Sequence, residues 1–233
     1  MNNLLSDYSA PILLSIELAT ITTLILLIIT LPLAWWLVHC RQGTKSIITA
    51  IATLPIILPP SVLGFYLLLL LGNQGPLGQL SDELGLGPLV FSFQGLVIAS
   101  VIYSFPFALQ PVLNAFENVD KKLLETAATL GASPQDRFKS IVLPLSKNGI
   151  LTSIVLSFAH TIGEFGVILM IGGNIPGETK TLSIAIFDHV EALEYTQAHI
   201  LSAGMLAFSF IVLLCVYLLN NAGVNNNPKA VKL

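Results

Sequence analysis

The hydrophobic pattern divides the chain into long apolar runs separated by short polar stretches. A helix rises about 1.5 Å per residue, so roughly 20 apolar residues are needed to cross the hydrocarbon of a bilayer. Five runs are long enough, and we predict that each is a membrane-spanning helix. They cover approximately residues 12–38, 47–71, 91–116, 150–171 and 200–219. The apolar run at 181–187 is too short to span, and it predicts a surface helix or a half-span on the outer side.

Composition agrees with this pattern, because 54% of the residues are hydrophobic and only 10% are charged. Soluble domains carry about 25% charged residues. We therefore expect an all-α, polytopic membrane bundle that forms one domain over residues 1–233. The net charge of −3 gives no indication of a nucleic-acid partner. The first ten residues lack Lys and Arg, so the first apolar run is predicted to be a span and not a cleavable signal.

Basic residues set the predicted orientation through the positive-inside rule. If the loop between the third and fourth runs is cytoplasmic, nine of the ten cations are inside: Arg41, Lys45, Lys121, Lys122, Arg137, Lys139, Lys147, Lys229 and Lys232. Lys180 is then the one cation outside. This asymmetry predicts an outer N-terminus and an inner C-terminus.

Prolines interrupt the second apolar run, where residues 54–60 read Leu-Pro-Ile-Ile-Leu-Pro-Pro. Each proline removes a backbone donor and bends or breaks its helix. Inside a bilayer this is tolerated where protein or water satisfies the freed carbonyls. The run therefore predicts a broken or strongly kinked helix, which either lines a substrate route or is a structural kink.

Residues 118–146 form a cytoplasmic loop that is too polar to span and too helical to be a plain linker. Asp120 is a predicted N-cap of a short Ala- and Leu-rich helix, and Gly131 is the expected residue just past its end. Ser133 then caps a second helix, with Pro134 at its first position and Asp136 completing the cap. Such a helix pair either docks into a groove of another protein or rests on the lipid headgroups.

This loop resembles the signature loop of ABC-importer permeases, in which Glu-Ala-Ala, a glycine and an Ile-x-Leu-Pro sequence follow at fixed spacing. The chain has Glu125-Thr126-Ala127, Gly131 and the sequence Ile-Val-Leu-Pro at 141–144, so Thr126 is its one departure. The resemblance implies a coupling helix that sits in a cleft of an ATP-hydrolysing subunit. The residues that it implies for this contact are Glu125, Thr126, Ala127, Ala128, Leu130, Gly131, Pro134, Leu143 and Pro144.

A second resemblance concerns the substrate. The sequence Gly-Glu-Phe-Gly at 163–166 and the stretch 173–182 are similar to molybdate permease subunits; sulfate permeases are similar here but typically longer. The resemblance implies the type I importer permease fold in a bacterial inner membrane, with two copies of this chain, two ATPase subunits that bind ATP and Mg, and a periplasmic binding protein. It implies molybdate, with tungstate, as the substrate, and sulfate or thiosulfate as the alternative.

Polar residues in the fourth apolar run recur at helical spacing. Ser153, Ser157, His160 and Glu164 fall on one stripe, which on a membrane helix should face protein or a water-filled path. We interpret the stripe as pore lining; the alternative is hydrogen bonding between helices. For Glu164, whose charge would repel an anion, we expect a structural or gate role. Asn174 lies in a glycine-rich loop predicted at the outer mouth, where it either meets the binding protein or makes an ordinary turn.

The patterns that the sequence lacks favour a non-catalytic subunit. It has no G-x-x-x-x-G-K-[ST] phosphate loop, so the ATPase is expected to be a separate chain and no cofactor or metal is expected in this one. A rival interpretation is a proton-coupled secondary carrier that uses Glu17 and Glu164, although it leaves the loop signature unexplained. An integral-membrane enzyme is a third, for which the predicted spans offer no nucleophile–base pair.

Overall fold

The computed structural model describes residues 2–225 and the side chains of residues 8–218. Residues 226–233, with the predicted inner cations Lys229 and Lys232, lie outside the described residues. The described chain is helical. The elements are α1 (Asn2–His39), α2 (Gln42–Ile57), α3 (Pro60–Leu71), α4 (Pro76–Glu83), α5 (Phe93–Glu117), α6 (Lys121–Thr129), α7 (Pro134–Arg137), the π-helix η1 (Phe138–Val142), α8 (Leu143–Leu145), α9 (Lys147–Gly163), α10 (Gly166–Gly172), α11 (Leu182–Glu191) and α12 (Tyr195–Asn225).

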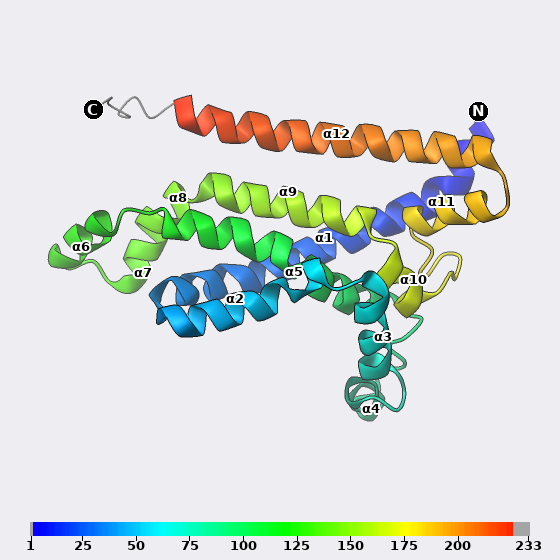
Figure 1. Cartoon of the computed structure of the whole chain (residues 1–233), viewed down its shortest axis with the longest axis horizontal. Coiled ribbons are helices and arrows are strands. Elements are labelled where there is room, and N and C mark those ends of the chain that lie inside the picture. Colours follow the sequence, from blue (N-terminus) through cyan, green and yellow to red (C-terminus); the bar gives the residue numbers. More distant parts are fainter. Residues whose placement is uncertain (1, 226–233) are drawn as a thin grey trace.

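The long helices run along the long axis of the molecule, and the short ones gather at its ends and side (Figure 1). α1, α2, α5 and α9 lie together, α6 and α7 occupy one end, and α3 with α4 projects sideways (Figure 1). α11 lies at the end opposite to α6. It has ten residues, or about 15 Å, which is half the thickness of the hydrocarbon. The short element predicted here is therefore confirmed as a helix too short to span, and its place on the outer side stays a prediction.

Three predicted spans are confirmed by helices that are long and apolar enough to cross a membrane. Within residues 2–225 these are Tyr8–His39, Phe93–Glu117 and Tyr195–Leu218. Two bent helix pairs raise the number of candidate spans to five. The structure therefore agrees with a polytopic membrane protein.

The second predicted span is broken, as its prolines indicate. α2 ends at Ile57, the extended residues Leu58 and Pro59 follow, and α3 starts at Pro60. The directions of α2 and of the segment Pro60–Glu83 differ by 110°. Proline at the first helical position suits a new helix start, which explains why the chain turns here.

The uninterrupted helix predicted over 150–171 is wrong. α9 ends at Gly163, Glu164 has an extended backbone with ψ of 134°, and α10 starts at Gly166. The glycines on both sides of Glu164 and Phe165 weaken the helix there. A polar carboxylate that caps a new helix then stabilises the interruption, as described below.

Apolar packing holds α1, α5 and α9 together and attaches the loop to them. One cluster of buried residues includes Leu37 of α1, Leu109 and Val112 of α5, and Val142 of η1. A second cluster joins α3, α5 and α10. The loop end of the molecule is therefore continuous with the core of the bundle.

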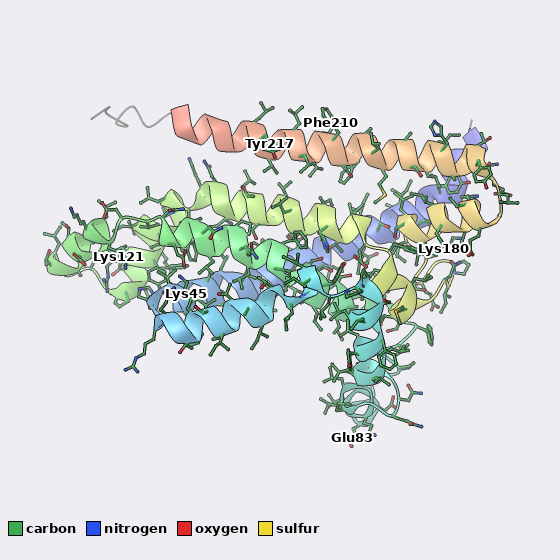
Figure 2. All side chains as sticks on the ribbon, in the orientation of Figure 1. Lys45, Glu83, Lys121, Lys180, Phe210 and Tyr217 are labelled. Carbon is green, nitrogen blue, oxygen red and sulfur yellow. The ribbon has the colours of Figure 1, made fainter. Side chains whose placement is uncertain are left out.

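The last helix, α12, packs weakly on the rest of the chain. None of its most apolar 18-residue window, within the described Tyr195–Leu218, is buried. Phe210 and Tyr217 stand on this helix, which lies along one side of the molecule (Figure 2). Both side chains are exposed.

Candidate functional site

Both short helices of the loop begin with the capping residues that the sequence predicts. The Asp120 carboxylate accepts a hydrogen bond from the backbone N–H of Lys122 at 2.9 Å. Ser133 and Asp136 form a reciprocal capping box, in which each side chain accepts the other's backbone N–H at 3.2 Å, and Pro134 is at the first helical position. The hydrogen bond from the Ser133 side chain, and to a lesser extent the one from its backbone N–H, lower the pKa of the Asp136 carboxyl. These predictions are confirmed.

Gly131 ends α6 in the left-handed conformation, with φ of +86°. The N–H of Gly131 donates to the carbonyl of Ala128, and the N–H of Ala132 donates to the carbonyl of Ala127, each at 3.0 Å. This pair of bonds defines a Schellman motif, which favours glycine at its left-handed residue. The predicted glycine turn is confirmed.

The outward surface of the loop carries most of the predicted contact residues. None of the described residues of α6 is buried, and Leu130 is 83% exposed. The hydroxyl of Thr126, the residue that departs from the family pattern, donates to the Lys122 carbonyl at 2.8 Å and so is satisfied within α6. An exposed apolar side chain on a polar loop is available for contact with another protein or with lipid. The exposed residues of the predicted set are Glu125, Thr126, Ala128, Leu130, Gly131, Pro134 and Pro144, whereas Ala127 and Leu143 are half-buried.

An aromatic cluster attaches the inward side of the loop to the bundle. The ring of Phe138 lies 5.0 Å from that of Trp35 in α1 and 5.8 Å from that of Phe116 in α5, between centroids. The hydroxyl of Ser146 also donates to the Ala115 carbonyl at 3.3 Å. These anchors were not predicted from the sequence, although an aromatic residue within a turn of the end of a span is a recognisable signal.

A cavity of about 500 Å³ separates part of the loop from the ends of the spans. Trp35, Phe116, Glu117 and Arg137 are among its lining residues. Glu117 also forms an ion pair with Lys45 of α2. The loop therefore contacts α1 and α5 through Phe138 of η1, and the ion pair joins the end of α5 to α2.

Two serines of the predicted polar stripe make hydrogen bonds inside the protein, one of them to α5. Ser153 and Ser157 are fully buried. The Ser153 hydroxyl donates to the Ala108 carbonyl of α5 at 2.8 Å, and the Ser157 hydroxyl donates to the Ser153 carbonyl at 2.7 Å. These contacts favour hydrogen bonding between helices over pore lining for Ser153. A role of either serine in a path stays a prediction.

His160 also lies against α5. Its Nδ1 is 3.0 Å from the Ser104 hydroxyl, and its ring stacks on Phe107 with centroids 3.9 Å apart. The Ser104 hydroxyl is in turn 3.0 Å from that of Thr161. Ser104 was missed, although Ser100 and Ser104 recur four residues apart in the third predicted span.

Glu164 is at the break between α9 and α10 and is 8% exposed. Its Oε1 accepts the backbone N–H of Val167 at 2.9 Å, so the carboxylate caps α10. By contrast, Glu17 of the rival interpretation is exposed and lies beside a cavity that Gly177 and Glu178, from the loop between α10 and α11, also line. The two glutamates therefore have different surroundings.

Asn174 is tied to α11. Its Nδ2 donates to both carboxylate oxygens of Asp188, at 2.8 and 3.0 Å, and Lys180 forms an ion pair with the same carboxylate at 2.5 Å. Partial burial alone would raise the pKa of Asp188, but the hydrogen bonds from Lys180 and Asn174 and the charge of Lys180 lower it overall. The loop between α10 and α11 is thus fixed to α11.

The predicted inner and outer lysines lie at opposite ends of the molecule. Lys45 and Lys121 lie at the end that carries the loop, whereas Lys180 lies at the opposite end (Figure 2). Among the described residues, no three His, Cys, Asp or Glu side chains gather closely enough to hold a metal ion.

Known proteins resemble this chain over most of its length. The family of binding-protein-dependent transport system inner membrane components matches residues 41–231. The chain is 55% identical over 208 residues to the molybdenum transport system permease protein ModB of Azotobacter vinelandii, covering 89% of this chain and 92% of that protein. It is 35% identical over 218 residues to a probable sulfate transport system permease protein cysT of Anthoceros angustus, covering 91% and 75%.

The fold is also that of a solved importer. A crystal structure of a bacterial alginate ABC transporter, in complex with an alginate pentasaccharide-bound periplasmic protein, matches 96% of this chain and 81% of its own chain with a TM-score of 0.69. At 16% identity this likeness concerns the fold alone. The described helices, the exposed loop and the match over residues 41–231 together lead to one conclusion: the chain belongs to the family of inner-membrane permease components of binding-protein-dependent transport systems.

Proposed function

We propose that this chain is the permease subunit of an ATP-driven molybdate importer and that it also carries tungstate. The observation that supports this most strongly is the 55% identity to a molybdenum permease over 92% of that protein. The sulfate relative is 35% identical, and only 75% of its length is matched, so it is the longer protein. Sulfate or thiosulfate is therefore the second candidate substrate.

The loop is the proposed contact for the ATPase. Its outer surface exposes Leu130 and the small residues around Gly131, while its inner surface is anchored on Trp35 and Phe116. This arrangement suits a lever, because a groove can hold the outer surface while the anchors transmit displacement to α1 and α5. ATP and Mg are bound by that separate subunit.

The complete importer would contain two copies of this chain, two ATPase subunits and a periplasmic binding protein. A path can be enclosed between two copies of one small permease chain. Two copies would be related by a twofold axis, the commonest symmetry of homo-oligomers. The basic residues at the loop end support a cytoplasmic loop, an outer N-terminus and an inner C-terminus. The alginate importer of similar fold was solved with a periplasmic protein bound.

The capping contact of Glu164 explains how a protein that carries an anion can hold a buried carboxylate, whose charge would otherwise repel the substrate. Its Oε1 is engaged by the N–H of Val167, so its negative charge is directed to a helix start. The rival proton carrier needs a relay between Glu17 and Glu164, and their different surroundings offer it little support. Uptake by the permease alone, in liposomes with a proton gradient, would favour the carrier.

The deciding experiment reconstitutes the permease with a candidate ATPase subunit and a candidate molybdate-binding protein. We expect labelled molybdate uptake that requires all three components and ATP, with competition by tungstate and much weaker competition by sulfate. Equal competition by sulfate would assign the chain to the sulfate class. Uptake without the ATPase would refute the importer assignment.

A further inference from the structure

The cavity between the loop and the ends of the spans is lined by two kinds of side chain. Its volume of about 500 Å³ is far larger than the roughly 30 Å³ that one water molecule occupies in the liquid. The apolar lining residues include Trp35, Val38, Phe116 and Leu124, and the charged ones are Glu117, Lys121, Glu125 and Arg137. A molecule with a charged end and an apolar part therefore suits this cavity.

Arg137 has hydrogen-bond donors that no described residue accepts. Its side chain is half-buried, and its Nε is shielded from solvent with no acceptor in the described part of the chain. No ion pair joins its guanidinium to a carboxylate of the described residues either. A guanidinium carries five N–H donors and stays charged in proteins, and a half-buried charge without a partner costs free energy. An anion that pairs with the guanidinium lowers this cost.

The carboxylates closest to Arg137 do not neutralise it. Glu117, in the same cavity, forms an ion pair with Lys45 of α2. Asp136, the neighbour of Arg137 in the sequence, belongs to the capping box of α7. Glu125 is exposed to solvent. The charge of Arg137 therefore remains available to a ligand.

Cations outnumber carboxylates at this end of the molecule. The segments 41–45 and 117–147 hold seven Lys and Arg residues and four Asp and Glu residues. Lys45 and Lys121 mark this end in Figure 2. Lys121 also lines the cavity, which therefore offers two cations to one ligand. The local charge favours an anionic ligand over a neutral one.

The cavity lies where two spans end. α1 ends at His39 and α5 ends at Glu117, and both are long and apolar enough to cross a membrane. Trp35 is half-buried near the end of α1, and aromatic residues at span ends are typical of the headgroup level. A phospholipid at this depth presents a charged phosphate together with apolar acyl chains. A free phosphate offers nothing to the apolar lining, so the lipid fits the cavity better.

We propose that this cavity binds an anionic phospholipid. Arg137 and Lys121 hold its phosphate, and Trp35 and Phe116 contact the first methylenes of its acyl chains; all four residues line the cavity. A guanidinium can pair with two phosphate oxygens at once, and basic pockets at the cytoplasmic ends of spans recognise anionic headgroups in other membrane proteins. The bound lipid joins the loop to α1 and α5 and so braces the proposed ATPase contact. The proposal is independent of which oxyanion the importer carries.

Lipid binding to the full-length chain, measured by native mass spectrometry, tests the phosphate contact. Phosphatidylglycerol is compared with phosphatidylcholine of the same acyl chains, in which a cation on the headgroup compensates the phosphate. We expect phosphatidylglycerol to bind more tightly, and Arg137→Gln to weaken its binding at least about tenfold. Arg137→Lys keeps the charge without the planar fork, so it should retain part of the affinity and shows that a folding defect is not the cause.

Lys139→Gln is the matched control. Lys139 lies two residues from Arg137 in η1, is exposed and is not among the residues that line the cavity. This variant removes the same charge, and binding should change by less than about twofold because exposed charges are screened at physiological salt. Equal weakening by Lys139→Gln and Arg137→Gln would indicate a general attraction by surface charge and would overturn the site.

The fluorescence of Trp35 reports where the lipid binds. Trp36→Phe leaves Trp35 as the only tryptophan, because the chain has two. Phosphatidylglycerol brominated on the upper part of its acyl chains should quench this fluorescence more strongly than phosphatidylcholine brominated at the same carbons. Adding Arg137→Gln should abolish the difference. Equal quenching by the two lipids while Arg137 is present would contradict the placement.

Inorganic phosphate distinguishes a lipid headgroup from a free ion as the ligand. At millimolar concentration and constant ionic strength, it should leave the quenching by brominated phosphatidylglycerol unchanged, because it gains nothing from the apolar lining. Displacement of the lipid by phosphate alone would make this a free-anion site and would refute the lipid assignment. These measurements use the permease without molybdate, ATP or partner proteins, so a failure of the importer assignment would leave their outcome unaffected.

Discussion

Gly131 offers a test of the loop in which a single physical effect operates. Its φ of +86° is a conformation that residues with a Cβ rarely adopt, and a Cβ added there would meet no described heavy atom within 4 Å. Gly131→Ala therefore introduces no clash. The cost is the left-handed backbone alone, about 1 kcal/mol.

That cost sets the size of the expected effect. A penalty of about 1 kcal/mol lowers the population of the correctly formed turn about fivefold relative to competing conformations. Gly131→Asn should cost less, because Asn tolerates the left-handed region, and Gly131→Val should cost more, because it is β-branched. Gly131→Asp adds a charge at the proposed contact, so it should leave the permease folded but uncouple ATP hydrolysis from uptake.

The assay is molybdate uptake and binding-protein-stimulated ATP hydrolysis in proteoliposomes, together with affinity for the ATPase. The control is Gly43→Ala. A Cβ added to Gly43 also meets no heavy atom within 4 Å, but this glycine lies in the helix α2 and not in a left-handed turn. Alanine favours a helix there, so this variant should transport normally. If the Val and Asp variants at position 131 matched the parental protein in uptake, the coupling role of the turn would be refuted.

Four further outcomes are expected. Leu130→Asp should leave the permease folded and weaken ATPase binding at least about tenfold, measured by co-purification, since an exposed apolar anchor is lost. Ser153→Ala should destabilise the protein by about 0.6 kcal/mol in a thermal shift and leave uptake unchanged; reduced uptake would instead support pore lining. Leu193 lies at the end of α11 with a φ of +59°. Leu193→Gly should raise the free energy of unfolding by about 0.5 kcal/mol, because the relief of left-handed backbone strain exceeds the entropy that glycine adds to the unfolded chain. Because Ser133 lowers the pKa of the Asp136 carboxyl, the cap is fully formed above the ordinary aspartate pKa and is lost as pH falls through the lowered value. The protection of the α7 amides against exchange, corrected for the intrinsic exchange rate at each pH, should therefore fall on acidification, and this fall should be absent in Asp136→Asn.

Local signals in the sequence predict the loop well. Asp120, Gly131 and Ser133 act on the backbone within three residues of themselves, so their roles follow from residue type and spacing. The prolines at 59 and 60 likewise predict the break before α3, because proline constrains its own helix. The π-helix η1 was not predicted; its first residue, Phe138, packs against Trp35 of α1, a long-range contact that residue type and spacing do not reveal.

Long-range contacts explain what the sequence did not predict. The apolar run at 150–171 conceals the break at Glu164, which depends on a hydroxyl from α11 and on the proximity of Pro60. Helical spacing correctly grouped Ser153 with Ser157 on one stripe. It gave no indication that α5 lies opposite, and this neighbour determines whether a serine bonds to protein or lines a path.

The loose packing of α12 has a consequence for biogenesis and handling. A helix whose apolar length buries almost nothing against its own chain obtains its stability from the surrounding lipid, so it can be inserted last without waiting for the other helices to fold. The same independence makes it the segment most sensitive to the choice of detergent. Extraction conditions that keep the other helices intact can therefore still detach this one, and bilayer thickness becomes a determinant of the native arrangement.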